Sequence, residues 1–487
     1  MSTMAIFRTP GIRAIEARFA ASSEPPLMER AGAAVAAAAS AMLGTDRQSI
    51  LVVAGPGNNG GDGFVAARRL KEQGISVVVV FFGAADHLPR DAGTALRAWQ
   101  SIGGRVLADI PRQDFALVVD ALFGIGLTRP VEGQPLSAIE HINALPCPIL
   151  AVDIPSGLCA DTGRVLGKAV RATRTITFIA GKPGLFTLDG PDHCGQVMVD
   201  ALGLDAGMPE GRLIGTDLFR DCLRPRHRNS HKGSFGAVGV IGGAPGMAGA
   251  ALLAGRAALK LGAGRVYVGL LDHLPVDPIQ PELMLRAADE AQSLATVLAT
   301  GPGLGQSDTA LALLRRAVES TLPLVLDADA LNLLASHPTL FKHQARRAAT
   351  TILTPHPAEA ARLLDVATEA VQADRVAAAL ELARRGQALV VLKGCGSIVA
   401  TPAGQWYINA TGNPGLASAG TGDVLTGCIA AFLAQGWPPT EALLAAVHLH
   451  GAAADGLSAA GTGPVGLAAG ELIDAARALL NRWLANA

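Results

Sequence analysis

Aromatic and charged residues are scarce in this chain, at 4% and 17% of the sequence. Its 40 basic and 41 acidic residues leave a formal charge of −1, which argues against a nucleic-acid binder that relies on bulk charge. Mean hydropathy is positive at +0.34, yet no apolar run approaches the ~18–20 residues that a membrane-spanning helix needs. The first 20 residues contain no apolar block, so they do not resemble a secretory signal.

Cysteine is also rare, and the six cysteines form no CxxC pair. This spacing argues against a zinc ribbon and against a disulfide framework. We therefore expect a cytoplasmic protein with no membrane segment and no nucleic-acid partner. The cysteines are Cys147, Cys159, Cys194, Cys222, Cys395 and Cys428.

Short apolar runs alternate with helix-length patterns in two stretches of the chain, which predicts an α/β protein with parallel sheets covered on both faces. A length of 487 residues suits about three ordinary domains or two large ones. The dense basic segment at residues 221–233 separates the two stretches, and we predict domains at 1–215 and 226–487. Strands are expected at 49–54, 76–82, 116–121, 148–152 and 173–179, then at 237–241, 265–270, 324–327, 351–354, 388–392, 397–400 and 405–408; helices at 33–40, 64–73, 90–102, 249–261, 358–364, 374–385 and 424–434.

A glycine-rich segment, GPGNNGGDG at residues 55–63, follows the first expected strand. It satisfies GxGxxG, and backbone N–H groups at such a turn can bind phosphate. However, the second strand does not end in the acid that a dinucleotide fold uses to hold a ribose, and Asp62 would repel a phosphate. An ordinary nicotinamide hydride-transfer site is therefore disfavoured. The simpler alternative is a turn in which Asp62 caps the next helix.

Two further strands end in an aspartate followed by glycine, at Asp120 and Asp153. Each aspartate could be a turn or cap residue, but three such loops at one edge of a parallel sheet favour a ligand site. Carboxylate, amide and hydroxyl oxygens from Asp120, Asn59 and Ser156 would also suit a hard cation.

The motifs GPGNNGGDG, DALFGIGLTRP, AVDIPSGL with ADTG, and TFIAGKPGL make residues 10–205 resemble the NAD(P)H-hydrate epimerase family. The resemblance implies a Rossmann-like domain that interconverts the R and S epimers of hydrated NADH or NADPH at C6 of the nicotinamide ring. It also implies that Asn59, Asp120 and Ser156 bind potassium. We hypothesise that Asp153 transfers the proton, because epimerisation requires loss of the hydroxyl or opening of the ring. The resemblance places the hydrate against Asn58, Asn59, Gly60, Gly61, Asp62, Gly124, Ile125, Gly126, Leu127, Thr128, Arg129, Pro130 and Asp153.

In the second half, the segment NPGLASAGTGDV at residues 413–424 precedes an apolar helix. The N–H groups and the positive end of the helix dipole would cradle a phosphoryl group. Asp423 would accept the proton of an attacking hydroxyl, although an aspartate there can also simply cap the helix. Lys393 in KGCGS would attract nucleotide phosphates, and His356 lies between two prolines at a strand end. Asp327 in DADALN would either steady a metal–nucleotide pair or cap the next helix.

Together HKGSFG, GPGLG, DADALN, TPHPAE, VLKG and GTGD make residues 226–485 resemble the ADP-dependent NAD(P)H-hydrate dehydratase family, which has a ribokinase-like fold. The resemblance implies that ADP phosphorylates the C6 hydroxyl of the S hydrate and that phosphate then leaves, giving NAD(P)H and AMP. Ser397 stands where threonine is expected. Mg²⁺ is expected with the diphosphate, and the sequence identifies no particular protein ligands for it. The implied hydrate-binding residues are Ala250, Gly303, His356 and Asp423, and the nucleotide-binding residues are Lys393, Gly394, Cys395, Gly396, Ser397 and Gly422.

The sequence thus predicts a bifunctional isomerase and lyase that repairs hydrated NADH and NADPH, with ADP as co-substrate. We also expect a homo-oligomer. One alternative is a ribokinase-like small-molecule kinase fused to a non-catalytic nucleotide-binding domain. GTGD and the Lys-Gly turn alone fit that kinase equally well, whereas the complete set of motifs does not.

Overall fold

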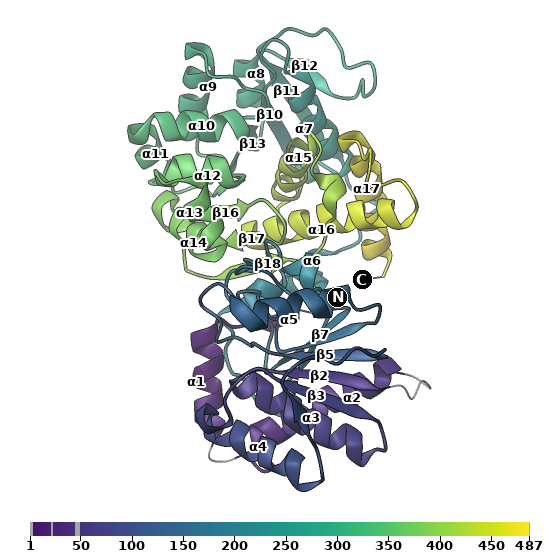
Figure 1. Cartoon of the computed structure of the whole chain (residues 1–487). Helices are drawn as coiled ribbons and strands as arrows, with labels where there is room; N and C mark the ends of the chain where they lie inside the picture. Colours follow the sequence, from purple (N-terminus) through teal and green to yellow (C-terminus); the bar gives the residue numbers. More distant parts are fainter. Residues whose placement is uncertain (1–2, 21–22, 44–48, 487) are drawn as a thin grey trace. The chain divides into compact units, whose positions relative to one another are not determined.

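The computed structural model describes residues 3–20, 23–43 and 49–486. The chain folds into two compact units, Met4–Gly211 and the chain from Arg212 onward. Within the described ranges, no helix combines the length and apolarity that crossing a membrane would require. The α/β class predicted from the sequence is confirmed, since both units contain a largely parallel sheet between helices (Figure 1).

The first unit contains a seven-stranded parallel sheet in the order β4-β3-β2-β5-β6-β7-β8. Strand β2 has β3 on one side and β5 on the other, so the strand order reverses there. In open parallel sheets, ligands bind at the carboxyl ends of the strands beside such a reversal. The strands are β2 Ile50–Ala54, β3 Val77–Phe81, β4 Val106–Leu107, β5 Leu117–Ala121, β6 Ile149–Val152, β7 Arg174–Phe178 and β8 Gln196–Asp200, and the short β1 spans Met4–Ile6.

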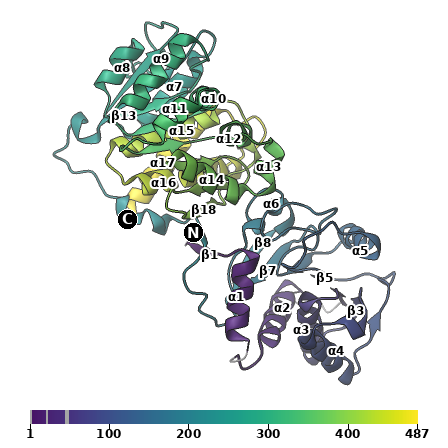
Figure 2. The same ribbon diagram turned by 90° about the vertical axis from the view of Figure 1, so that its left-hand side faces the viewer.

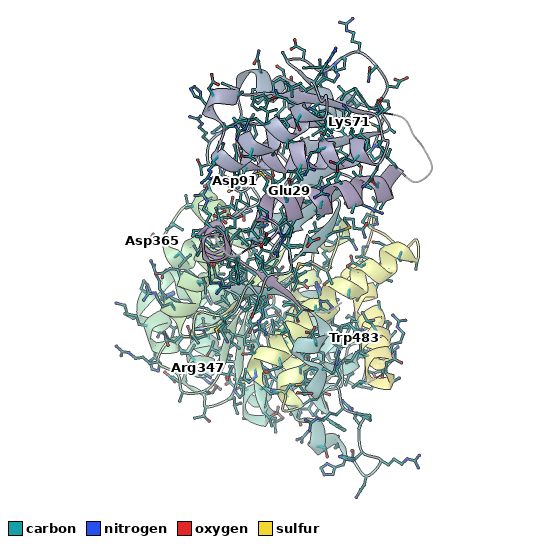
Figure 3. All side chains as sticks on the ribbon, turned by 90° about the horizontal axis from the view of Figure 1, so that it is seen from below. Glu29, Lys71, Asp91, Arg347, Asp365 and Trp483 are labelled. Carbon is teal, nitrogen blue, oxygen red and sulfur yellow. The ribbon has the colours of Figure 1, made fainter. Side chains whose placement is uncertain are left out.

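Alternate residues of the central strand β2 face opposite layers of helices. Ile50, Val52 and Ala54 belong to the core beneath α2, α3 and α4, whereas Leu51 and Val53 belong to the core beneath α5. Figure 2 shows α2, α3 and α4 side by side, and Glu29 of α2 accepts hydrogen bonds from Arg68 of α3 (Glu29 is labelled in Figure 3). The helices are α1 Thr9–Phe19, α2 Leu27–Leu43, α3 Asn58–Glu72, α4 Arg90–Ser101, α5 Gly133–Ala144 and α6 Gly190–Cys194.

The sheet of the second unit runs β9-β18-β17-β16-β15-β14-β13-β10-β11-β12. It is parallel from β16 to β12, and β16, β17 and β18 pair in antiparallel fashion. Its strand order reverses between β10 and β13. The strands are β9 Gly211–Leu213, β10 Ala237–Gly242, β11 Arg265–Leu270, β12 Met284–Arg286, β13 Val297–Thr300, β14 Leu324–Leu326, β15 Thr351–Leu353, β16 Leu389–Leu392, β17 Ser397–Ala400 and β18 Trp406–Asn409.

Helices also cover both faces of this second sheet (Figures 1 and 2). One face buries residues such as Val238 and Val240 beneath α7 Ala248–Lys260, α15 Thr421–Ala434, α16 Pro439–Ala459 and α17 Ala469–Ala485. The remaining helices are α8 Ala288–Leu294, α9 Asp308–Glu319, α10 Ala328–Ser336, α11 Pro338–Gln344, α12 Pro357–Leu364, α13 Thr368–Ala373 and α14 Arg375–Gly386.

Two helices with glycine-rich starts begin several residues earlier than the sequence predicts. The helix expected from residue 64 begins at Asn58, and the one expected from residue 424 begins at Thr421. Glycine disfavours helix interiors, and so the pattern placed both glycine-rich segments outside the helices. In the structure these segments form the first turns, which puts their backbone N–H groups at the helix N-termini.

Two candidate active sites

A cavity of about 440 Å³ lies at the carboxyl ends of β2, β5 and β6 in the first unit. It brings together most of the residues that the sequence predicted to contact the hydrate. Gly60, Gly61 and Pro130 do not line it. The predicted residues that do line it are Asn58, Asn59, Asp62, Gly124, Ile125, Gly126, Leu127, Thr128, Arg129 and Asp153.

Two glycines allow the segments that form this cavity to approach each other. A Cβ added at Gly60 would lie 2.0 Å from the carbonyl oxygen of Gly55, and one added at Gly55 would lie 1.8 Å from that of Leu122. Neither position therefore tolerates a side chain. Gly57 is the N-cap of α3, and so the interpretation of Asp62 as a helix cap is wrong. Asp62 lies beyond the first turn and lines the cavity.

Asp153 is held in place by a buried lysine. Lys182 is 0% exposed, and its Nζ donates to Asp153 Oδ1 at 2.5 Å, to Thr177 Oγ1 at 2.6 Å and to the Phe178 carbonyl at 2.9 Å. Thr177 Oγ1 also donates to Asp153 Oδ1, at 3.2 Å. The other oxygen, Oδ2, faces Gly124, where an added Cβ would be 3.3 Å away. One oxygen of Asp153 is thus fixed by the lysine, and the other remains available at the cavity.

Asp62, another carboxyl at this cavity, is in a different electrostatic environment. Burial raises the pKa of Asp62 well above its ordinary value, and the negative charges of Asp153 and Glu16 raise it further. No ion pair between Asp62 and a basic side chain is present in the described part of the chain. The cavity therefore contains one carboxylate with a cationic partner, Asp153, and two carboxyl groups, Asp62 and Glu16, whose pKa is raised mainly by burial.

The three residues predicted to bind potassium lie beside this cavity. Asp120, in β5, is fully buried and accepts a hydrogen bond from Ser156 Oγ at 2.6 Å and from Ser156 N at 2.8 Å. Burial raises the pKa of Asp120 to about 6, although the Ser156 hydrogen bonds oppose the rise. Asn59 is buried as well, and its Nδ2 has no hydrogen-bond partner among the described residues. A buried carboxylate that has no basic partner among the described residues and is hydrogen-bonded to the Ser156 hydroxyl fits a hard monovalent cation.

In the second unit, the predicted phosphate cradle forms the N-terminus of α15. Gly420 is the N-cap with φ 88°, a conformation that favours glycine, and Asp423 is the third helical residue. The N-cap residue is Gly420, so Asp423 is not the residue that caps this helix. A Cβ added at Gly422 would lie 3.3 Å from Lys393 Nζ. The ammonium group therefore lies against the half-buried backbone of the first turn, where an anion would bind.

Lys393 and Asp423 influence each other's charge. Burial raises the pKa of Asp423 to about 7; Asp327 adds to the rise, and Lys393 opposes it. Burial alone would lower the pKa of Lys393, but the carboxylates of Asp327 and Glu359 outweigh burial and leave it raised. Near neutral pH the site therefore combines a permanent cation with a carboxylate suited to accepting a proton.

The turn after Lys393 is shaped by two glycines and a buried arginine. Gly394 and Gly396 have φ values of 145° and 63°. Arg375 donates to the carbonyl of Lys393 at 3.2 Å, and a Cβ added at Gly394 would lie 2.7 Å from the Arg375 guanidinium. Ser397 Oγ donates to the carbonyl of Gly394 at 3.0 Å, and Cys395 is exposed. These hydrogen bonds fix the conformation of the turn, and its Cys395 side is exposed to solvent.

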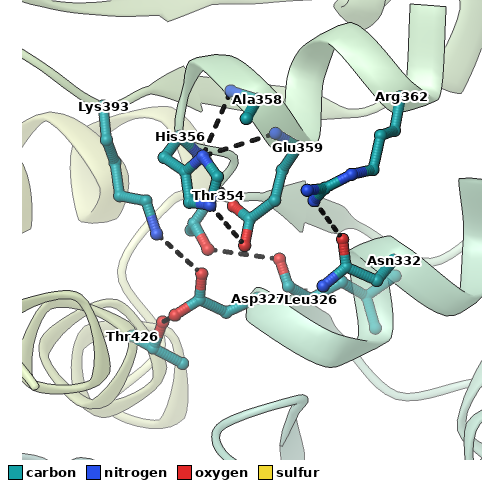
Figure 4. Close-up of polar contacts among 10 residues, drawn as sticks. All are labelled: Leu326, Asp327, Asn332, Thr354, His356, Ala358, Glu359, Arg362, Lys393 and Thr426. Atoms are coloured by element: carbon teal, nitrogen blue, oxygen red, sulfur yellow. Dashed lines mark hydrogen bonds and ion pairs between the residues drawn. The ribbon is translucent and has the colours of Figure 1, made fainter. Parts of the chain in front are cut away.

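The three other residues predicted to bind the hydrate have different environments. Gly303 has φ 58°, and a Cβ added there would lie 3.2 Å from Ala250 Cβ, so these two residues meet beside the reversal between β10 and β13. His356 is the N-cap of α12, and its Nδ1 accepts from the backbone N–H groups of Ala358 and Glu359 (Figure 4). His356 thus has a structural role, whereas its contact with the hydrate stays a prediction.

Sequence reasoning missed several residues at these sites. Lys182 lies within the TFIAGKPGL motif, but nothing in the motif indicates that its side chain turns back to Asp153. Arg13 and Glu16 of α1 line the first cavity from outside the predicted glycine-rich loops. Thr426 donates to Asp327 Oδ2 at 2.8 Å in the second unit. The described residues contain no group of three or more His, Cys, Asp or Glu side chains that could hold a metal ion.

Comparison with known protein families gives one matching family model for each half of the chain. A family model described as NAD(P)H-hydrate dehydratase matches residues 238–476, and one described as YjeF-related protein N-terminus matches residues 24–184. A ribokinase-like superfamily protein from Enterococcus faecalis V583 aligns with 57% of this chain and 99% of its own, at 27% identity and a TM-score of 0.50. This likeness supports the ribokinase-like fold expected of the second unit.

Two further relatives are similar in sequence. The ADP/ATP-dependent NAD(P)H-hydrate dehydratase from Bacillus subtilis, co-crystallized with ATP/Mg²⁺, is 31% identical over 56% of this chain and 98% of its own, with a TM-score of 0.49. The bifunctional NAD(P)H-hydrate repair enzyme Nnr of Coxiella burnetii is 40% identical over 493 residues, which cover 98% of this chain and 99% of that protein. This chain therefore belongs to the family of bifunctional NAD(P)H-hydrate repair enzymes.

Proposed function

We propose that the chain repairs hydrated NADH and NADPH at two separate sites, as an NAD(P)H-hydrate epimerase in residues 1–215 and an ADP-dependent NAD(P)H-hydrate dehydratase in residues 226–487. Family membership supports the pair of activities. One observation supports the assignment of residues: each unit has a carboxylate beside a lysine at the carboxyl edge of its sheet. Asp153 pairs with the buried Lys182, and Asp423 lies near the half-buried Lys393. The first site supplies the epimer that the second consumes.

At the first site, Asp153 and Asp62 share the proton transfers of epimerisation. Loss of the C6 hydroxyl as water and opening of the ring both move a proton to and from an oxygen or nitrogen of the substrate. Asp62, whose pKa is raised by burial, donates a proton. Asp153 accepts one through Oδ2, because Lys182 and Thr177 occupy Oδ1. The residues named above as lining the cavity would hold the hydrate between the two carboxyl groups.

Potassium would be held at the first site by Asn59, Asp120 and Ser156. When bound, it would supply a positive charge next to the buried Asp120 and would fix the loop that follows β5, because Ser156 Oγ also accepts from Phe123 N at 2.9 Å. That loop continues into Gly124–Pro130. We expect epimerisation to be faster in potassium than in lithium salts at equal ionic strength.

At the second site, Asp423 accepts the proton of the C6 hydroxyl as its oxygen attacks the terminal phosphorus of ADP. AMP is the leaving group. The N–H groups at the start of α15 and the ammonium of Lys393 stabilise the charge on the transferring phosphoryl group. Phosphate then leaves with the C6–O bond electrons and a proton leaves C5, which restores the C5=C6 double bond. Mg²⁺ would accompany the diphosphate, and water and phosphate oxygens would provide most of its ligands.

The test uses the full-length chain and two variants, Asp153→Asn and Asp423→Asn. Mixed hydrate epimers are incubated with ADP, and dihydronicotinamide absorbance is followed after spontaneous epimerisation has been subtracted. We expect the wild type to recover both epimers, Asp153→Asn to recover only the S hydrate, and Asp423→Asn to recover neither. Wild-type rates in either variant would contradict that residue's role. A stable phosphorylated product formed from another small molecule, without hydrate turnover, would favour the fused kinase instead.

We also propose a cytoplasmic location and a homo-oligomeric state. The first is supported by the free thiols of Cys147, Cys159, Cys194, Cys222 and Cys428, which suit a reducing compartment. Sedimentation of the purified chain would measure the second.

A further inference from the structure

Asp327 occupies a helix-cap position without capping the helix. It follows β14 directly and is the N-cap of α10, but its side chain accepts no hydrogen bond from the first turn of α10. The next residue, Ala328, has φ 49°, a conformation that alanine adopts only at a cost. The strained backbone at the start of α10 thus accompanies an Asp327 carboxylate that makes its hydrogen bonds elsewhere.

Both oxygens of this carboxylate are used by residues from other elements. Lys393 Nζ donates to Oδ1 at 2.9 Å, and Thr426 Oγ1 donates to Oδ2 at 2.8 Å (Figure 4). Asp327 and Thr426 are buried. One buried carboxylate thus links the end of β14, the turn after β16 and the first half of α15.

Each partner of Asp327 adjoins a residue to which we assign a role in phosphoryl transfer. Thr426 lies three residues after Asp423 on α15, so the two side chains lie on the same face of the helix. Lys393 Nζ lies 3.3 Å from the position that a Cβ would take at Gly422, and that Cβ would be 3.9 Å from Asp327 Oδ2. Asp327 therefore restrains both the Lys393 ammonium and the start of α15, and the phosphoryl group would be transferred between these two.

We propose that Asp327 is a positioning residue for the dehydratase reaction: it holds the Lys393 ammonium against the backbone of Gly422 and keeps the first turn of α15 in register with it. The inference rests on the proposed roles of Lys393 and Asp423. Of the two roles that the DADALN motif suggests for Asp327, the helix cap is wrong, because this carboxylate accepts no hydrogen bond from the first turn of α10.

Removing the charge of Asp327 should also change how Asp423 titrates. Asp423 is influenced by Asp327, Lys393 and Asp329. Without Asp327, Lys393 would interact mainly with Asp423 and Glu359, and its positive charge would favour the ionised form of Asp423. The acid limb of the pH–rate profile should then move to lower pH. The other titratable groups near Lys393 are His356 and His450, and burial lowers the pKa of both.

The test compares Asp327→Asn, Thr426→Val and Thr426→Ser in the full-length enzyme, with Asp289→Asn as a control. Asp289 forms an exposed ion pair with Arg316, and neither residue belongs to the motifs that contain Asp327 and Asp423. Steady-state rates with the S hydrate and ADP are measured from pH 5.5 to 9, and calorimetry measures ADP affinity. We expect Asp327→Asn to lower kcat/KM for ADP on the order of 10²-fold, the cost of a misplacement of about 1 Å, and to shift the acid limb to lower pH. Thr426→Val should lower kcat/KM less, while Thr426→Ser and the control should match the wild type.

A purely structural role would give a different result. Asp327→Asn would then lower the rate only in proportion to the loss of folded protein seen in thermal unfolding, with an unchanged pH profile and unchanged ADP affinity, and the proposal would be overturned. Wild-type kinetics in Asp327→Asn would overturn it as well. If Asp423→Asn and Lys393→Met also kept wild-type rates, the assigned dehydratase site itself would be wrong.

Discussion

The most direct consequence of the electrostatics at the second site is that Asp423 should weaken the fold. Its pKa rises from the ordinary value of 3.8 to about 7 on folding, so the folded state binds a proton more tightly than the unfolded state does. The folded state therefore loses stability as the pH rises from about 4 to about 7, and it bears the full cost above pH 7. Replacing Asp423 by the neutral Asn should remove this cost.

The size of the effect follows from the same pKa. A change of about three units corresponds to at most ~4 kcal/mol of unfolding free energy, since each unit is worth about 1.36 kcal/mol. Asp423 is only partly buried, and solvent screening reduces the value to about 2 kcal/mol. Domains of about 150–250 residues shift by roughly 2–4 °C per kcal/mol, so in this somewhat larger unit the apparent Tm should rise by about 4 °C or slightly more. The side chain accepts no hydrogen bond from a described residue that Asn would break.

Thermal unfolding of full-length wild type and Asp423→Asn, at pH 5 and at pH 8.5, measures the effect. The variant should gain stability mainly at pH 8.5, and dehydration at that pH should fall by ~10²–10⁴-fold, the usual contribution of a general base. A variant that is equally stabilised at both pH values, or that loses stability at pH 8.5, would refute the electrostatic reasoning. Wild-type dehydration would refute the catalytic role.

Three other substitutions test particular contacts. Lys182→Met leaves Asp153 buried without its cation, which should lower the free energy of unfolding by about 3–5 kcal/mol. Recovery of the R hydrate should be abolished, whereas recovery of the S hydrate should persist at a temperature at which the variant stays folded. Unchanged R turnover would exclude the ion pair from epimerisation. Gly422→Ala adds a methyl group beside the lysine ammonium at the phosphate cradle and should raise the KM for ADP at least tenfold, while Gly470→Ala, whose Cβ would meet nothing within 4 Å, should not. Ser156→Ala should abolish any difference between potassium and lithium in the epimerase rate, as measured with R hydrate under ADP-coupled recovery; a preserved preference would place the cation elsewhere.

Much of both sites could be predicted because their residues lie at strand ends. Continuous apolar runs locate buried parallel strands, and Asp120, Asp153 and Asp423 follow such runs or precede an apolar helix. Contacts between distant segments could not be predicted in the same way. Thr426 and Asp327 are 99 residues apart, and the pairing of Lys182 with Asp153 depends on the bend after β7. Helix α16 was missed because its buried residues lie all around it, so it shows no amphipathic period.

The backbone of Asp153 restricts which substitutions can probe the first site. Its φ of 66° lies in the left-handed region, which Asn and Asp tolerate far better than most other residues with a Cβ. Alanine or glutamate there would alter the backbone energy as well as the carboxylate, so a loss of activity could not be attributed to chemistry. Asparagine keeps the shape and the preferred conformation while removing the charge. Asp153→Asn therefore tests the carboxylate's part in the reaction without changing the backbone conformation, which an alanine substitution would not do.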